Sequence, residues 1–87
     1  MQTFESALQQ QLRSKKKLSM RDKRILRVLD GAPSAARTRK INRWENGARG
    51  VIGADPTAGV IDWSKIDWAK LFEVILAMIA KFLDIAL

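Results

Sequence analysis

Positive charge and apolar side chains are concentrated in opposite halves of this chain. Residues 1–50 hold 13 Lys and Arg against 4 Asp and Glu, whereas residues 51–87 hold 3 against 5. The net charge of +7 therefore comes entirely from the first half. A segment this basic favours a polyanionic partner, and the apolar segment that follows it needs another apolar surface. The sequence thus predicts a protein that connects two kinds of partner.

Size and composition limit what the chain can do alone. Its 87 residues allow one small domain with a thin core, so we expect an extended or assembly-dependent protein rather than a compact monomer. The chain has no Cys and no His, which excludes disulfides, thiolate nucleophiles, imidazole bases and nearly all transition-metal sites. We expect no enzymatic activity, no metal and no cofactor. The N-terminus lacks the order of a secretory signal, so we expect a cytoplasmic or virion location.

Helix-capping residues and apolar spacing predict an all-α chain whose first half forms three short basic helices. Thr3, Ser19 and Ser34 are suitable N-caps, and Asp22 completes a capping pair with Ser19. Gly and Pro residues mark the expected helix ends. The three helices are expected over residues 4–17, 20–30 and 35–46.

A glycine-rich segment and one long hydrophobic helix follow. Residues 47–61 contain four Gly and one Pro, which is typical of a flexible linker. Residues 62–87 form the expected final helix, with Asp62 and Asp67 capping and flanking its start. Its charged residues fall in one narrow sector of a helical wheel, and the remaining circumference is apolar. The expected organisation is a basic helical arm (1–46), a flexible linker (47–61) and a hydrophobic anchoring helix (62–87).

The apolar circumference of the final helix predicts a contact with protein or lipid. Glu73 and Lys81 leave seven uncharged residues between them, far fewer than the roughly 18 of a membrane span. This favours packing against a second copy or another shell protein, with membrane association as the alternative. The residues expected to anchor the chain or to form the oligomer are Trp63, Trp68, Leu71, Phe72, Ile75, Leu76, Ile79, Phe82 and Leu83.

The basic half predicts contacts with the phosphate backbone of nucleic acid. Eight of its 13 basic residues are Arg, whose guanidinium binds phosphate oxygens bidentately. Because phosphates carry no base information, we expect sequence-independent binding. Trp44 stands beside Ile41 and is expected to pack rather than to stack on a base. The candidate nucleic-acid-binding residues are Arg13, Lys15, Lys16, Lys17, Arg21, Lys23, Arg24, Arg27, Arg37, Arg39, Lys40, Arg43 and Arg49.

One short segment resembles a known family. Residues 41–47, with the sequence INRWENG, resemble the end of the recognition helix in Cro/repressor-type helix-turn-helix proteins. The resemblance covers seven residues, and residues 30–33 do not show the scaffold-helix pattern that precedes it in that family. We therefore do not assign the family.

The function that best fits both halves is that of a non-enzymatic structural protein. Its basic arm would bind nucleic acid, and its C-terminal helix would anchor it in a protein shell or membrane, as in a small viral or phage virion component. One alternative is a membrane-active oligomerising protein of the holin or toxin kind, with its basic segment on the cytoplasmic side. A second is a small helix-turn-helix DNA-binding regulator, which requires the second and third helices to pack at a fixed angle.

Overall fold

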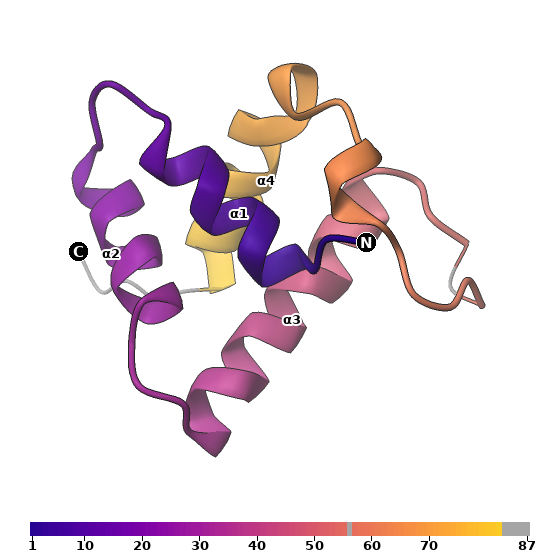
Figure 1. Ribbon diagram of the computed structural model, residues 1–87, viewed down its shortest axis with the longest axis horizontal. Helices are drawn as coiled ribbons and strands as arrows, with labels where there is room; N and C mark the ends of the chain where they lie inside the picture. The colour runs from indigo at the N-terminus through magenta and orange to yellow at the C-terminus, as the bar shows by residue number, and fades with distance from the viewer. Residues whose placement is uncertain (56, 83–87) are drawn as a thin grey trace.

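The chain is built from helices throughout residues 1–55 and 57–82, which are the residues that the computed structural model describes (Figure 1). Within these ranges there is no strand, and the predicted all-α class is confirmed. The elements are α1 (Phe4–Arg13), α2 (Met20–Leu29), α3 (Ala35–Val51), the 3₁₀-helix η1 (Trp63–Lys65) and α4 (Trp68–Phe82).

The predicted helix starts are confirmed by hydrogen bonds from the capping side chains. Thr3 Oγ1 accepts from Ser6 N at the start of α1. Ser19 and Asp22 form a reciprocal capping box on α2. Asp62 accepts from Ser64 N to cap η1. Each bond satisfies a backbone N–H that a helix start leaves without an intrahelical partner.

The helix ends differ from those expected. Helix α1 ends at Arg13 rather than at residue 17. Helix α3 does not stop at Gly47 but continues through Gly50 to Val51, so the expected start of the linker is wrong. Gly47 lies where α3 crosses α4, and a Cβ at this position would overlap Met78 Sδ. Glycine is used here for close helix approach, not for helix termination.

The expected final helix is shorter and interrupted. Its first part is the single 3₁₀ turn η1, and α4 begins only at Trp68. The side chain of Asp67 accepts from Lys70 N, in the first turn of α4, as expected of a residue that flanks a helix start. Residues 83–87 of the expected helix lie outside the described residues.

A single hydrophobic core joins all five elements. From α4 it takes Trp68, Ile75, Leu76 and Ile79, which pack with the apolar stripes of the three basic helices and with Trp63. The radius of gyration is 12.4 Å, close to the value of about 12 Å expected for a compact chain of this length. The expectation of an extended chain is therefore wrong. The apolar sides of α1, α2 and α3 together cover much of the surface that α4 offers.

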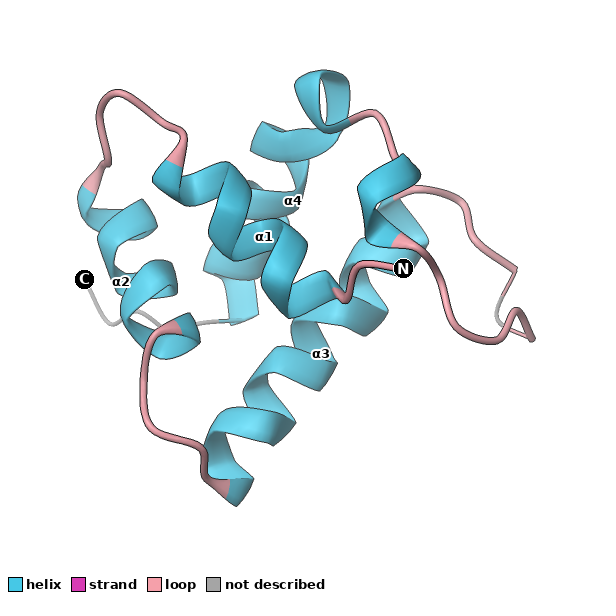
Figure 2. Cartoon of the chain, viewed as in Figure 1, coloured by secondary structure: helices cyan, strands magenta, loops and turns pink. Residues whose placement is uncertain are grey.

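The N-terminal residues are hydrogen-bonded to the chain segment that leads into α4. Gln2 N donates to Asp62 Oδ1, and Trp63 N donates to Gln2 O, both at 3.0 Å. The bond from Gln2 N, together with bonds from the Ser64 hydroxyl and backbone N–H, lowers the pKa of the Asp62 carboxyl to about 2. The N-terminus therefore lies beside η1. A long loop connects α3 to η1, whereas short loops connect α1, α2 and α3 in turn (Figure 2).

We predict that Leu76→Asp destabilises the monomer itself rather than an assembly. Leu76 is fully buried, so an aspartate there would be desolvated without a partner, at a cost of about 3–5 kcal/mol. Val74→Asp is the matched control, because Val74 lies on the same helix but is 51% exposed, and it should cost less than about 1 kcal/mol. Thermal unfolding followed by circular dichroism measures both. Equal stability of the two variants would contradict the position of α4 in the core.

A second prediction tests the extension of α3. Gly50→Ala should raise the free energy of unfolding by about 0.5–1 kcal/mol, because Gly50 is helical and a Cβ there meets no atom within 4 Å. Gly47→Ala should gain less or lose stability, because the methyl group must displace Met78. Urea denaturation of the two variants gives the comparison. If neither substitution changes stability, residues 47–51 are not part of a helix.

Candidate nucleic-acid interface

The 13 basic residues of the first half divide into two groups. Five make ion pairs: Arg13, Lys15, Arg21, Arg37 and Arg49. The other eight are exposed and make no ion pair with any residue of 1–55 or 57–82: Lys16, Lys17, Lys23, Arg24, Arg27, Arg39, Lys40 and Arg43. The single set expected from the sequence thus contains cations that hold the fold together and cations that face solvent.

The strongest ionic cluster surrounds the buried carboxylate of Asp22. This side chain has no exposed surface and accepts from Lys15 Nζ at 2.6 Å and from Arg21 Nε at 3.1 Å. The same two cations also bind Glu73 of α4, at 3.1 and 2.9 Å. The cluster therefore joins the α1–α2 loop, α2 and α4. Lys15 and Arg21 act as structural residues here, with their charges neutralised by neighbours.

Hydrogen bonding keeps the buried Asp22 ionised. Burial by itself raises the pKa of this carboxyl, but bonds from Lys15, the Ser19 backbone and Arg21 outweigh burial and lower the pKa to about 2. The pKa of Glu73 is lowered by its bonds to Arg21 and Lys15. Two carboxylates and two cations thus remain charged together over a wide pH range.

Arg37 and Arg49 are also committed to the fold. Arg37 donates from Nε to Val28 O at 3.0 Å and from Nη2 to Leu29 O at 2.6 Å, which satisfies carbonyls at the end of α2. Arg49 donates to Ala58 O and to Gly59 O at 3.1 and 3.0 Å. It thereby holds the long loop after α3 against that helix.

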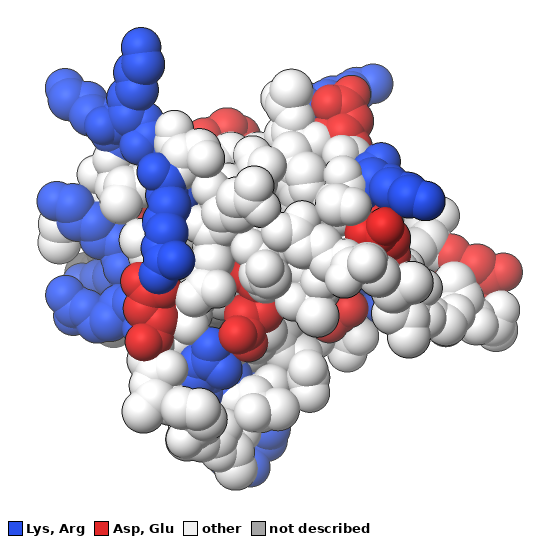
Figure 3. Space-filling model, in the orientation of Figure 1, with Lys and Arg blue, Asp and Glu red and all other residues white. Residues whose placement is uncertain are grey.

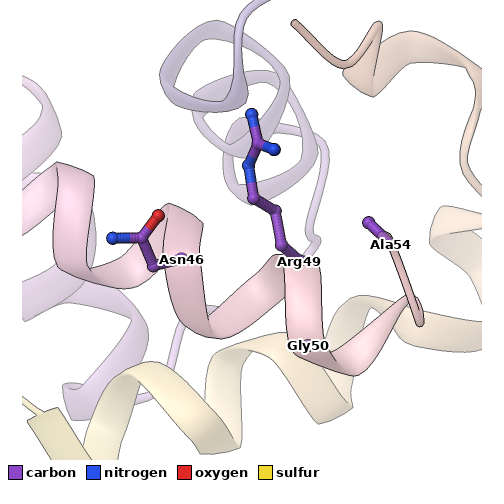
Figure 4. A pocket seen from close by; sticks show the side chains of 4 residues that line it. All are labelled: Asn46, Arg49, Gly50 and Ala54. Carbon is purple, nitrogen blue, oxygen red and sulfur yellow. The ribbon is translucent and has the colours of Figure 1, made fainter. Parts of the chain in front are cut away.

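Arg49 also lines a surface depression together with Asn46, Gly50 and Ala54 (Figure 4). Its guanidinium points away from Asn46 in this view, toward the loop whose carbonyls it binds. The guanidinium of Arg49 is already hydrogen-bonded within the fold. Together with the single amide of Asn46 it does not form a set of groups that could transfer a proton or hold a metal.

The solvent-facing cations lie mainly on the α1–α2 loop and α2. Figure 3 shows the blue side chains gathered along the edge of the molecule that these two segments form, at the left of the view. Lys23, Arg24 and Arg27 are spaced i, i+1 and i+4 on the exposed side of α2, and Lys16 and Lys17 precede them in the loop. We call these five cations, which lie within residues 16–27, the α2 cationic edge.

The outward side of α3 carries the other solvent-facing cations. Arg39 and Arg43 lie on it, and Lys40 lies at its border. The exposed amides of Asn42 and Asn46 lie between and beyond the two arginines. These two residues are not among the candidates predicted from the sequence, although their spacing from Arg39 of three and seven residues places them on the same side of a helix. On the opposite side Trp44 is 1% exposed, which confirms that it packs.

The predicted anchoring residues are mostly inside the molecule. Trp63, Trp68, Ile75, Leu76 and Ile79 belong to the core. Leu71 and Phe72 are partly buried, Phe82 is 44% exposed, and Leu83 lies outside the described residues. The indole N–H groups of both tryptophans are used internally, toward Glu45 and the Trp63 carbonyl. Most of this set therefore stabilises the monomer.

No helix among the described residues combines the length and the apolar content needed to cross a membrane. Those residues also contain no group of three Asp or Glu side chains placed to hold a metal ion.

A comparison of the chain with protein-family models, with curated proteins and with solved structures returned no match.

The Asp22 cluster predicts a specific loss of stability in acid. Because the pKa of folded Asp22 is about 2 and that of an unfolded aspartate is about 3.9, the carboxylate stabilises the fold above about pH 4 by about 2–3 kcal/mol. This contribution is lost as the pH falls toward 2. Urea unfolding at several pH values should show the decline, and Asp22→Asn should reduce it.

The matched control for this measurement is Asp55→Asn. Asp55 is exposed, and hydrogen bonds from Thr57, two residues away, lower its pKa, so this variant should reduce the decline less than Asp22→Asn does. An Asp22→Asn variant with the parent pH profile would show that the cluster does not stabilise the fold.

Proposed function

We propose that this protein binds nucleic acid through its phosphate backbone and performs no catalysis. The observation that carries the proposal is the set of eight exposed cations on the α1–α2 loop, α2 and α3 that have no acidic partner in the described chain. A cation paired within the fold gives little to a ligand, because its charge is already neutralised. Solvent-facing cations release condensed counterions when they bind phosphates, and this release drives association.

The α2 cationic edge is the main phosphate-binding surface in this proposal. Its five cations are exposed, and α2 is fixed beneath them by Ile25 and Leu29 in the core and by the Asp22 cluster. Lys23, Arg24 and Arg27 are therefore held on a rigid support and need little ordering when a polyanion binds.

The C-terminal helix exposes a smaller apolar surface than the sequence predicts for its anchoring role. Val74 and Phe82 are the large apolar side chains of α4 with the greatest exposure, and Leu71 and Met78 are partly buried nearby on that helix. Attachment to a protein shell or membrane would therefore use this strip and not the tryptophans. Nucleic-acid binding is the part of the expected function that the exposed chemistry supports best.

The salt dependence of binding tests the proposal. If about 5–8 phosphates are contacted, log K should fall with log salt concentration at about −0.7 to −0.9 per phosphate. The triple variant Lys23→Gln, Arg24→Gln, Arg27→Gln should make this slope shallower by about two to three units. Fluorescence anisotropy with a labelled mixed-sequence oligonucleotide at several salt concentrations measures both.

The control has the same change in net charge at another place. Lys65→Gln, Lys70→Gln and Lys81→Gln remove three exposed cations from η1 and α4. This variant should keep a slope close to that of the parent chain. Equal effects of the two triple variants would mean that only net charge matters, and absence of binding at low salt would refute the proposal.

A further inference from the structure

The N-terminal half of α3 projects from the body of the protein. Every residue of 31–40 is exposed except Arg37, so the first turns of this helix are solvated on almost all sides. In Figure 1 this end of α3 lies at the lower edge of the molecule, reached from α2 by a short loop. The helix becomes amphipathic only from Ile41 onward, where it enters the core. The outward side of α3 is therefore exposed both on the projecting turns, which carry Arg39, and on the following turns, whose other side packs on the core.

The projecting turns are held firmly in place. Arg37 connects them to the last carbonyls of α2 and forms an ion pair with Glu5 of α1 at 3.0 Å. Ser34 caps the helix by accepting from Arg37 N. At the other end Trp44 and Ala48 are buried in the core. A helix fixed at both ends presents its outward side chains in a preformed arrangement, which lowers the entropy cost of recognition.

The outward side chains form a stripe with a distinct chemistry. Arg39, Asn42, Arg43 and Asn46 are spaced i, i+3, i+4 and i+7, and all are exposed. We call these four residues the α3 stripe. The acidic residue of this helix, Glu45, lies off the stripe and accepts from Trp63 Nε1. The stripe therefore combines positive charge with two neutral amides, whereas a surface built only to attract phosphates needs no amides.

We propose that the α3 stripe enters the major groove of duplex DNA and contacts base edges. An α-helix is about 10–12 Å wide with its side chains, which matches the B-form major groove of about 12 Å. Arginine can bind the O6 and N7 atoms of guanine bidentately, and asparagine the N6 and N7 atoms of adenine. The narrow major groove of A-form RNA does not admit a helix. The inference rests on the proposed function, to which it adds duplex DNA as the partner and sequence preference.

The neighbouring groups fit this placement. Lys40 lies at the border of the stripe, where a phosphate of the groove wall would be met. Ala35 and Ala36 precede the stripe, so their small side chains do not hinder close approach at its N-terminal end. Arg37 acts here as a positioning residue, since its guanidinium is occupied by Val28 O, Leu29 O and Glu5.

Selection from a pool of random duplexes tests the inference with the full chain. Bound DNA is sequenced after several rounds, and the enriched sequence is compared with a shuffled duplex of equal length and composition. We expect a preferred site containing guanine and adenine that binds at least about 10-fold tighter than the shuffled duplex. Single-stranded DNA and duplex RNA of the same sequence should compete more weakly than the DNA duplex.

Uncharged substitutions distinguish base contacts from phosphate contacts. Asn42→Ala and Asn46→Ala should each weaken binding to the preferred site by about 5- to 100-fold, while the shuffled duplex is bound as before and the salt slope is unchanged. Gln10→Ala is the control, because Gln10 also carries a neutral amide and is exposed, but it belongs to α1 rather than to α3. It should keep the preference of the parent chain.

The possible failures are separable. Salt-dependent binding without an enriched sequence, or with single strands or duplex RNA competing as well as duplex DNA, overturns the role of the α3 stripe and leaves phosphate binding in place. Asn42→Ala and Asn46→Ala variants that retain the preferred site also overturn it. Absence of any binding at low salt overturns both proposals.

Discussion

The fold depends on the burial of Trp63 at the junction of three segments. Its ring packs edge-on against Phe4 of α1 at a centroid distance of 4.9 Å. Its indole N–H donates to Glu45 of α3, and its carbonyl accepts from the indole of Trp68 at the start of α4. One side chain and its backbone thus bring α1, α3 and α4 together, and an indole can do this because a large apolar ring carries a single donor that must be satisfied when buried.

This junction explains how so basic a chain can be compact. Positive charges repel one another, and concentrating them on three short helices opposes packing. In the structure eight of the cations are exposed to solvent, which screens the repulsion between them. Five others neutralise acidic side chains, above all around Asp22. The surface that results is a rigid array of cations on which a polyanion can bind without first folding the protein.

Much of the local structure could be predicted from the sequence. Thr3 and Ser19 were recognisable as caps because capping chemistry acts over three or four residues. The charged side of α4 was also identifiable, since Lys70, Glu73 and Lys81 are exposed as the helical wheel requires. The role of Gly47 could not be predicted, because it depends on Met78, which lies 31 residues away in the chain. Asn42 and Asn46 were not predicted as candidate contact residues, because a neutral amide can be recognised as one only when the exposed side of its helix is known.

The sequence by itself determined the helical class, the starts of the first three helices and the excess of positive charge in the first half, because these properties follow from near neighbours and composition. Only the tertiary structure decided which apolar residues of α4 are buried, which cations are neutralised and which remain on the surface. Burial and ion pairing join residues far apart in the chain, as Arg21 and Glu73 show. The physical reason is that desolvation depends on what packs against a side chain, and a single helix does not specify its neighbours.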